Sequence, residues 1–281
     1  MQYSKKTATV ATSLRFQHYL FFREIGSLIP ETVPLTEIKQ VLDVCCGPGA
    51  WCIEMASLYP DMQIVGVDID ADLIRIAQQD VVQARESLPI FECCTSLEKL
   101  PYASNRFDFI HLYHSNAGTT PQIRPALLLE LWRILRPGGW INLVELEIGP
   151  VSSAAADTLF SHLRQVASND IGELRLTSAV LYPQLLAQAG YRDIQYSLYP
   201  VDLGNQKGHM GRDYVMSVLA NDRQIASFLD RMGVATREEV EVLLRNMIQD
   251  AQQIDYFCAG MLISAIGVKP FLTSGDTPVL G

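Results

Sequence analysis

The sequence lacks the long apolar segments and leader features that would assign a chain to membrane or secreted proteins. None of its apolar runs approaches the roughly 20 residues needed to cross a bilayer, so we expect no membrane span. Two lysines near the N-terminus are followed by no long apolar block and no small-residue cleavage site. We therefore expect no secretory signal and a cytoplasmic location.

Basic residues are also in short supply. The 281 residues include 22 Lys and Arg against 31 Asp and Glu, which leaves a formal net charge of -9 and a pI of about 5.0. A surface this acidic repels phosphate backbones, and no run of Lys or Arg offsets it. We expect no nucleic-acid partner.

The six cysteines lack the spacing of a metal site. None of them stands in a CxxC pair, so we expect no structural zinc and no other metal. Five lie in or beside apolar runs, which predicts reduced and buried thiols. The six are Cys45, Cys46, Cys52, Cys93, Cys94 and Cys258.

What the sequence does contain is an alternation of apolar runs with helical segments. The expected strands are 40–45, 63–68, 90–94, 107–113, 140–147, 193–202 and 257–270. The expected helices are 13–29, 49–58, 71–86, 122–135 and 178–189, with further helix within 212–254. This order predicts an α/β protein with a doubly wound, mostly parallel sheet that binds ligands at the carboxyl ends of its strands.

Residues 41–70 have the pattern of a nucleoside-binding unit. An apolar run ends in Asp43, a turn containing Gly47 and Gly49 follows, and a second apolar run ends in Asp68. Glycines let the backbone approach a ligand, and a carboxylate after the second strand can accept ribose hydroxyls. NAD, FAD and S-adenosylmethionine all contain that nucleoside. The third glycine of a dinucleotide fingerprint is replaced by Cys52, which disfavours NAD.

Four motifs in order resemble one family. They are VLDVCCGPGAWCIEMA, YPDMQIVGVDID, LPYASNRFDFIHL and LLLELWRILRPGGWINLVELE. With them the chain resembles the class I S-adenosylmethionine-dependent methyltransferases, and within these the GxGxW small-molecule methyltransferases of bacterial and fungal secondary metabolism. The resemblance implies a Rossmann-like methyltransferase fold with seven strands and a helical cap, and S-adenosyl-L-methionine as cofactor.

The resemblance also implies roles for individual residues. Asp68 would accept the ribose hydroxyls, and Ile69 would pack on the adenine. The methionine end would be held by Asp43, Cys45, Gly47 and Gly49. The remaining implied cofactor contacts are Trp51, Thr95, Ser96, Leu97 and His111. Two departures stand out: Cys45 replaces a glycine, and the usual acid after the third strand is absent.

Candidate catalytic groups follow the fourth and fifth strands. His114 opens a glycine-containing loop and is our first choice of general base, and Glu145 is the second. Tyr113 is a further candidate, and alternation along the strand predicts that it shares a face with His111. Each also has a purely structural interpretation, as a loop histidine or a paired buried carboxylate.

We interpret residues 1–281 as a single methyltransferase domain. Its parts are an N-terminal helical cap (1–37), a cofactor-binding core (38–150) and a helical insert (204–254) that would form part of a substrate lid. Residues expected to line the acceptor pocket are Phe16, Gln17, His18, Tyr19, Phe21, Phe22, His209, Met210, Tyr214, Met216 and Phe228. Such a lining suits a small apolar or aromatic acceptor.

Two other functions remain open at this level. One is an S-adenosylmethionine-binding protein with a regulatory or non-methylating role, since a fold does not imply a reaction. The other is a nicotinamide oxidoreductase, which Cys52 disfavours. The acceptor and its reacting atom cannot be deduced from the sequence, and a homodimer is an expectation only.

Overall fold

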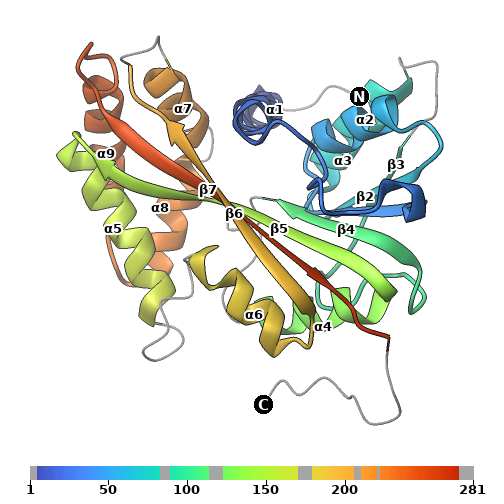
Figure 1. Ribbon diagram of the computed structural model, residues 1–281. Helices are drawn as coiled ribbons and strands as arrows, with labels where there is room; N and C mark the ends of the chain where they lie inside the picture. Colours follow the sequence, from blue (N-terminus) through green and yellow to red (C-terminus); the bar gives the residue numbers. More distant parts are fainter. Residues whose placement is uncertain are drawn as a thin grey trace. The chain divides into compact units, whose positions relative to one another are not determined.

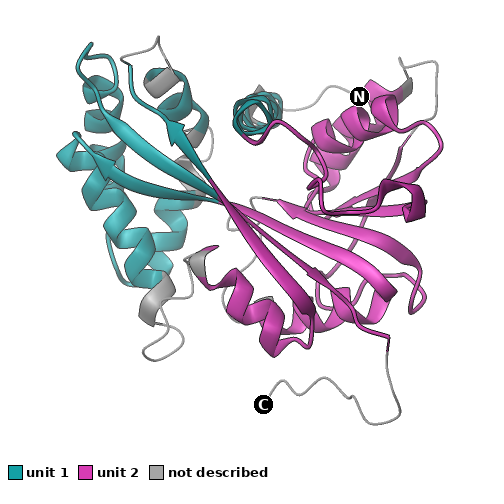
Figure 2. Ribbon diagram, in the orientation of Figure 1, with its two compact units in different colours: residues 1–24, 146–178, 199–262 teal, residues 25–145, 179–198, 263–281 magenta. Residues whose placement is uncertain are grey.

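The computed structural model describes residues 5–82, 89–113, 123–169, 179–205, 210–219 and 222–271. The chain divides into two compact units, shown in Figure 2. Unit 1 comprises residues 1–24, 146–178 and 199–262, and unit 2 comprises residues 25–145, 179–198 and 263–281. None of the described helices is long and apolar enough to cross a membrane.

Among the described residues, seven strands form one sheet in the order β3-β2-β1-β4-β5-β7-β6 (Figure 1). The strands are β1 (Gln40–Val44), β2 (Gln63–Asp68), β3 (Ile90–Cys93), β4 (Phe107–Tyr113), β5 (Leu135–Val151), β6 (Arg192–Asp202) and β7 (Cys258–Val268). The β3–β2, β2–β1, β1–β4 and β4–β5 ladders are parallel. This arrangement confirms the predicted α/β class.

The helices of unit 2 follow the predicted alternation with the strands. They are α2 (Ala50–Leu58), α3 (Ala71–Val82), α4 (Ile123–Ile134) and α6 (Tyr182–Gln188). Helix α4 ends just before the RPGG segment as predicted, but β5 begins at Leu135 instead of residue 140. The early start has a local cause, because the Gly138 N–H donates to the carbonyl of Lys269 just after β7.

Unit 1 contains one helix that the sequence reasoning missed. The described helices of unit 1 are α1 (Lys5–Ile25), α5 (Ala154–Asn169), α7 (Met210–Leu219), α8 (Asp222–Arg231) and α9 (Arg237–Asp250). Helix α5 was not predicted, although Ser153 precedes it and its hydroxyl accepts a hydrogen bond from Ala156 N–H, as an N-cap does. Helix α1 begins well before residue 13 and ends four residues before residue 29.

Asp108 of β4 forms hydrogen bonds with residues at the amino ends of β1 and β5. Its Oδ2 accepts hydrogen bonds from the backbone N–H groups of Lys39 and Gln40, each at 2.7 Å. Its Oδ1 accepts from Nε of Arg136. The FD pair at the start of β4 therefore aligns β4 with β1 and β5, so that their carboxyl ends meet at one edge.

A buried lysine after β7 also stabilises unit 2. Lys269 is 4% exposed, and its Nζ donates to the carbonyls of Trp132 and Leu135 and to Oδ1 of Asn105, at 2.7–2.9 Å. Burial lowers the pKa of this amine to about 8, so it is charged at neutral pH. The ammonium group thus pairs with the free carbonyls at the end of α4.

We expect Lys269→Met to lower the free energy of unfolding by about 3 kcal/mol, because two buried carbonyls and the Asn105 amide oxygen lose a charged donor. Denaturant unfolding at pH 7 measures the loss. The matched control is Lys39→Met, which removes an exposed lysine side chain and should leave stability unchanged. Equal stability of the two variants would contradict the assigned role of Lys269.

Candidate cofactor site and active site

The loop between β1 and α2 has three residues in the left-handed region. Cys45, Gly47 and Gly49 have φ values of 60°, 53° and 76°. A Cβ atom added at Gly49 would overlap the ring of Phe91, so this position requires glycine on two grounds. Cys45 adopts the backbone conformation that glycine adopts most readily. The first departure from the family pattern therefore places a residue other than glycine in the left-handed region, at a cost of about 1 kcal/mol.

Asp68 joins this loop to the end of β2. Its Oδ2 accepts a hydrogen bond from Gly47 N–H at 2.8 Å, and its Oδ1 accepts from Asp70 N–H at 2.9 Å. The capping of α3 falls to Asp70, whose Oδ1 accepts from the N–H groups of Asp72 and Leu73. Asp68 therefore does not cap α3, and its carboxylate lies at the tip of β2.

The Asp68 carboxylate fits a ribose diol. The side chain is buried, and burial raises its pKa, while hydrogen bonds from the N–H groups of Asp70 and Gly47 act in the opposite direction. A carboxylate has about four acceptor sites, so beside its backbone donors Asp68 keeps lone pairs for hydroxyl groups. The chemistry of this group matches the role that the resemblance implies.

Asp43 and His111 form a buried pair across β1 and β4. The two residues are partners in the strand register, and His111 Nδ1 donates to Asp43 Oδ1 at 3.0 Å. The other oxygen of Asp43 accepts from the Cys52 thiol at 3.3 Å. Asp43 therefore holds the imidazole in the tautomer that carries its proton on Nδ1.

Aromatic rings stack on His111. The Trp51 ring lies 4.2 Å from the imidazole with an interplanar angle of 8°, and the Tyr113 ring lies 5.8 Å away at 14°. The predicted shared face of His111 and Tyr113 is thus confirmed. Trp51 is buried, and its Nε1 donates to the Leu28 carbonyl at 3.3 Å. Its contact with the cofactor stays a prediction.

The thiols around the loop are free and protonated. All six cysteines are unpaired, as predicted, but Cys93 is exposed and Cys45 is half-buried. Burial raises the pKa values of Cys45, Cys46 and Cys52. The charge of Asp43 raises all three further, and the charge of Asp68 raises those of Cys45 and Cys46. Within the described ranges, no cluster of three or more His, Cys, Asp or Glu side chains is arranged to hold a metal ion.

The loop after β3 begins beside Asp68. The Cys94 N–H donates to the Asp68 carbonyl at 2.9 Å, so the next residues lie at the same sheet edge. Of these, Thr95 is exposed, Ser96 is half-buried and Leu97 is buried. Ile69, which would pack on the adenine, is 47% exposed. Their contacts with adenine stay predictions.

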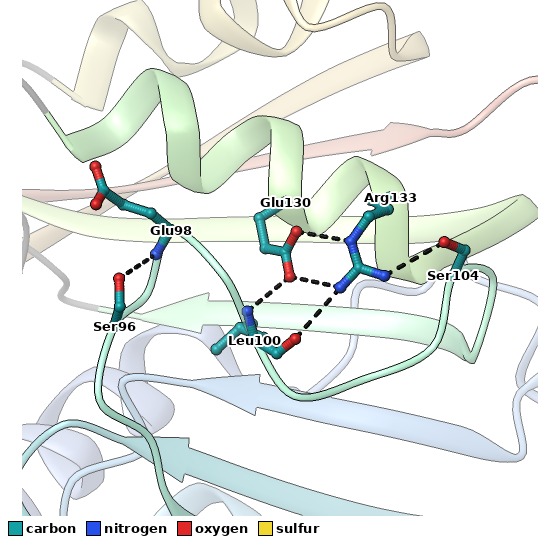
Figure 3. A network of polar contacts seen from close by, with 6 residues as sticks. All are labelled: Ser96, Glu98, Leu100, Ser104, Glu130 and Arg133. Atoms are coloured by element: carbon teal, nitrogen blue, oxygen red, sulfur yellow. Dashed lines mark hydrogen bonds and ion pairs between the residues drawn. The ribbon is translucent and has the colours of Figure 1, made fainter.

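A polar network that the sequence reasoning missed holds this loop against α4 (Figure 3). Glu130 accepts from Leu100 N–H at 2.7 Å and binds Arg133 with both carboxylate oxygens, at 2.6 and 2.8 Å. Arg133 also donates to the Leu100 carbonyl at 3.3 Å. Burial acts to raise the pKa of Glu130, but these hydrogen bonds outweigh it and leave the pKa lowered.

The two proposed catalytic residues that the structure describes, Tyr113 and Glu145, lie on opposite faces of the sheet. Glu145 is fully buried, and Tyr182 Oη donates to its Oε2 at 3.4 Å. In β5, Asn142 is the register partner of His111, so alternation places Glu145 on the face opposite His111 and Tyr113. His114 lies outside the described residues. Only Tyr113 therefore shares a described surface with the buried pair.

This sheet order, with a glycine loop after β1 and a buried acid at the end of β2, is similar to the fold of a solved methyltransferase that binds S-adenosyl-L-methionine. Residues 41–139 match the family model described as the methyltransferase domain. S-adenosylmethionine is the cofactor of this class, and Asp68 and the glycine loop suit its nucleoside.

The chain spans about half the length of the curated relatives it matches. It is 28% identical over 114 residues to demethylmenaquinone methyltransferase of Lactiplantibacillus plantarum. This alignment covers 40% of this chain and 47% of that relative. It is 28% identical over 168 residues to the probable methyltransferase ltbC of Aspergillus luteorubrus, which covers 56% of this chain and 58% of that relative.

Among solved structures, phosphoethanolamine N-methyltransferase 2 of Haemonchus contortus, in complex with S-adenosyl-L-methionine, is similar in fold. Its TM-score is 0.55 at 16% sequence identity, and the match covers 89% of this chain and 52% of that chain. At this identity the likeness shows the fold alone.

Proposed function

We propose that this protein transfers a methyl group from S-adenosylmethionine to a small apolar or aromatic acceptor. The observation that carries the proposal is the buried Asp68 carboxylate, bonded to Gly47 of the glycine loop within the matched segment 41–139. Supporting it, the relatives named above are methyltransferases.

The residues of this chain mainly position the reactants. When bound, S-adenosylmethionine supplies a methyl group on a sulfonium sulfur, which leaves readily. Asp68 would bind the ribose hydroxyls, Asp43 and the Cys45–Gly49 loop would hold the methionine end, and the Thr95–Leu97 loop would line the adenine edge. Orientation of this kind contributes ~7–11 kcal/mol to catalysis in general.

A general base accelerates transfer to an acceptor that must lose its proton, such as a hydroxyl group. His114 stays our first proposal, because it directly follows Tyr113 at the end of β4. Glu145 stays the second, although its hydrogen bond with Tyr182 also suits a structural role. Replacing each in turn and measuring the pH dependence of turnover separates the two.

The proposal predicts that the protein binds S-adenosylmethionine and S-adenosylhomocysteine and does not bind NAD. Calorimetry with each ligand measures this, and a screen for S-adenosylhomocysteine release against small phenols, amines and carboxylic acids then tests turnover. Tight NAD binding without a response to S-adenosylhomocysteine would overturn the proposal. Cofactor binding with no release against any acceptor would favour the non-methylating alternative.

Further parts of the proposal rest on the sequence. The net charge of -9 supports a small-molecule partner over a nucleic acid. The resemblance to the GxGxW methyltransferases supports a place in secondary metabolism, and a cytoplasmic location is proposed with it. A homodimer is proposed as well, and light scattering of the purified chain tests it.

We also propose that residues 13–29 and 204–254 act as a cap for the acceptor. Supporting evidence is that both α1 and α7–α9 belong to unit 1, away from the matched segment in sequence. If the proposal holds, these segments exchange amide hydrogen more slowly when S-adenosylhomocysteine is present. Unchanged exchange in both segments would contradict the proposed cap role.

A further inference from the structure

The segment that follows β3 is fixed at two points within unit 2. At its start, the Cys94 N–H donates to the Asp68 carbonyl at 2.9 Å. Six residues later, the Leu100 N–H donates to Glu130 of α4 at 2.7 Å, and the Leu100 carbonyl accepts from Arg133 at 3.3 Å. One pair of side chains therefore holds both backbone groups of Leu100 (Figure 3).

The pair that holds Leu100 is itself fixed in orientation. Arg133 binds both carboxylate oxygens of Glu130, at 2.6 and 2.8 Å, which is the bidentate geometry of a strong ion pair. Glu130 is 7% exposed and Leu100 is 2% exposed, so little water competes for these hydrogen bonds. Such a contact holds the chain in one place, which an exposed surface ion pair does not.

Between the two fixed points, the Thr95–Leu97 loop contains no acidic side chain. The Ser96 hydroxyl accepts from the Glu98 N–H at 3.1 Å and so stabilises the loop itself, and the Leu97 side chain is buried. Such a loop offers a ligand mainly its backbone N–H and C=O groups. Backbone groups cannot adjust by changing rotamer, so recognition by them depends on where the chain is held.

Adenine presents a donor and an acceptor side by side. Its 6-amino group donates and its N1 accepts, so a backbone carbonyl and a backbone N–H match this edge. Hypoxanthine has the same ring system but inverts both groups, with an oxygen at C6 and a proton on N1. A loop held in one place distinguishes the two bases, because the wrong base leaves polar groups of the site unpaired.

We propose that Glu130 and Arg133 are positioning residues for the cofactor, which hold the Thr95–Leu97 loop where its backbone recognises the edge of the adenine. This inference deepens the proposed function and rests on it, because it requires that S-adenosylmethionine binds with its adenine at this loop. It assigns the purine specificity of the site to two side chains of α4 that act through Leu100.

Two ligands that differ only at the purine edge test the inference. S-adenosylhomocysteine carries adenine, and S-inosylhomocysteine carries hypoxanthine on the same ribose and homocysteine. In calorimetry we expect the wild-type protein to bind S-adenosylhomocysteine about tenfold more tightly, the effect of one hydrogen bond. Glu130→Gln should bind the two ligands with nearly equal affinity. Arg133→Met keeps the bond between Glu130 and Leu100, so it should show an intermediate preference.

The affinity ratio separates positioning from a general loss of structure. A variant that only destabilises the fold weakens both ligands by the same factor, because the ribose and homocysteine are common to them. Glu98→Gln is the matched control, since it removes an exposed carboxylate close to the loop and should keep the wild-type ratio. A thermal melt verifies that each variant is folded, and Arg133→Met serves as the test if Glu130→Gln is not.

Three results would overturn the inference. They are equal affinity of the wild type for both ligands, a wild-type ratio kept in the folded variants of Glu130 and Arg133, and a ratio lost in Glu98→Gln. Binding of S-adenosylhomocysteine by the wild type tests the proposed function by itself. A wild type that binds both ligands equally well would therefore contradict this inference and leave the proposed function standing.

Discussion

Asp68→Ala should weaken the binding of S-adenosylhomocysteine at least 100-fold while the protein stays folded. The complex would lose the two hydrogen bonds between the Asp68 carboxylate and the ribose, each worth about 1.5–3 kcal/mol because the acceptor is charged. It would also release the Gly47 N–H and so loosen the glycine loop. Calorimetry measures the affinity, and a thermal melt verifies the fold.

Asp70→Ala is the matched control, because it removes a carboxylate two residues away that caps α3 instead. We expect it to cost about 1 kcal/mol of stability and little affinity. If Asp68→Ala kept wild-type affinity, Asp68 would have no part in cofactor binding.

Acidification should have a related effect on the wild type. Burial raises the pKa of Asp68, so its carboxylate takes up a proton at a higher pH than an ordinary aspartate. A protonated carboxyl group accepts hydrogen bonds less strongly, so affinity should fall as the pH decreases through this raised pKa. Asp68→Asn should bind weakly at every pH in the series.

Asp43→Ala should lower the free energy of unfolding by about 3 kcal/mol. It leaves His111 Nδ1 and the Cys52 thiol without their shared buried acceptor. It also removes a group that the resemblance assigns to the methionine end of the cofactor, so affinity for S-adenosylhomocysteine should fall as well. Denaturant unfolding and calorimetry measure the two losses.

Two further variants serve as controls for Asp43→Ala. Asp43→Asn keeps an oxygen that can accept from His111, so it should lose about 1 kcal/mol only. Asp61→Ala removes an exposed aspartate and should leave stability unchanged. If Asp43→Ala were as stable as Asp61→Ala, the buried pair would not stabilise the fold.

Most of the cofactor-binding core could be predicted from stretches of contiguous sequence. The strand–loop–helix–strand unit was predicted from 41–70 because apolar periodicity, glycine turns and strand-terminal acids are all local signals. The capping role of Asp70 was predictable for the same reason, since a cap bonds to residues two and three positions later. The resemblance added the roles of Asp43 and Asp68, which their strand-end positions allow.

Only the tertiary structure decided which distant side chains meet. Asp43 and His111 are 68 residues apart, and they pair because β1 and β4 are neighbours in one particular register. The register between β4 and β5 likewise placed Glu145 on the face opposite His111. Gln17 and Ser217 are 200 residues apart and meet through helix packing. Sequence periodicity tells which face a residue occupies within its own element, but pairing between elements depends on the packing of the whole chain.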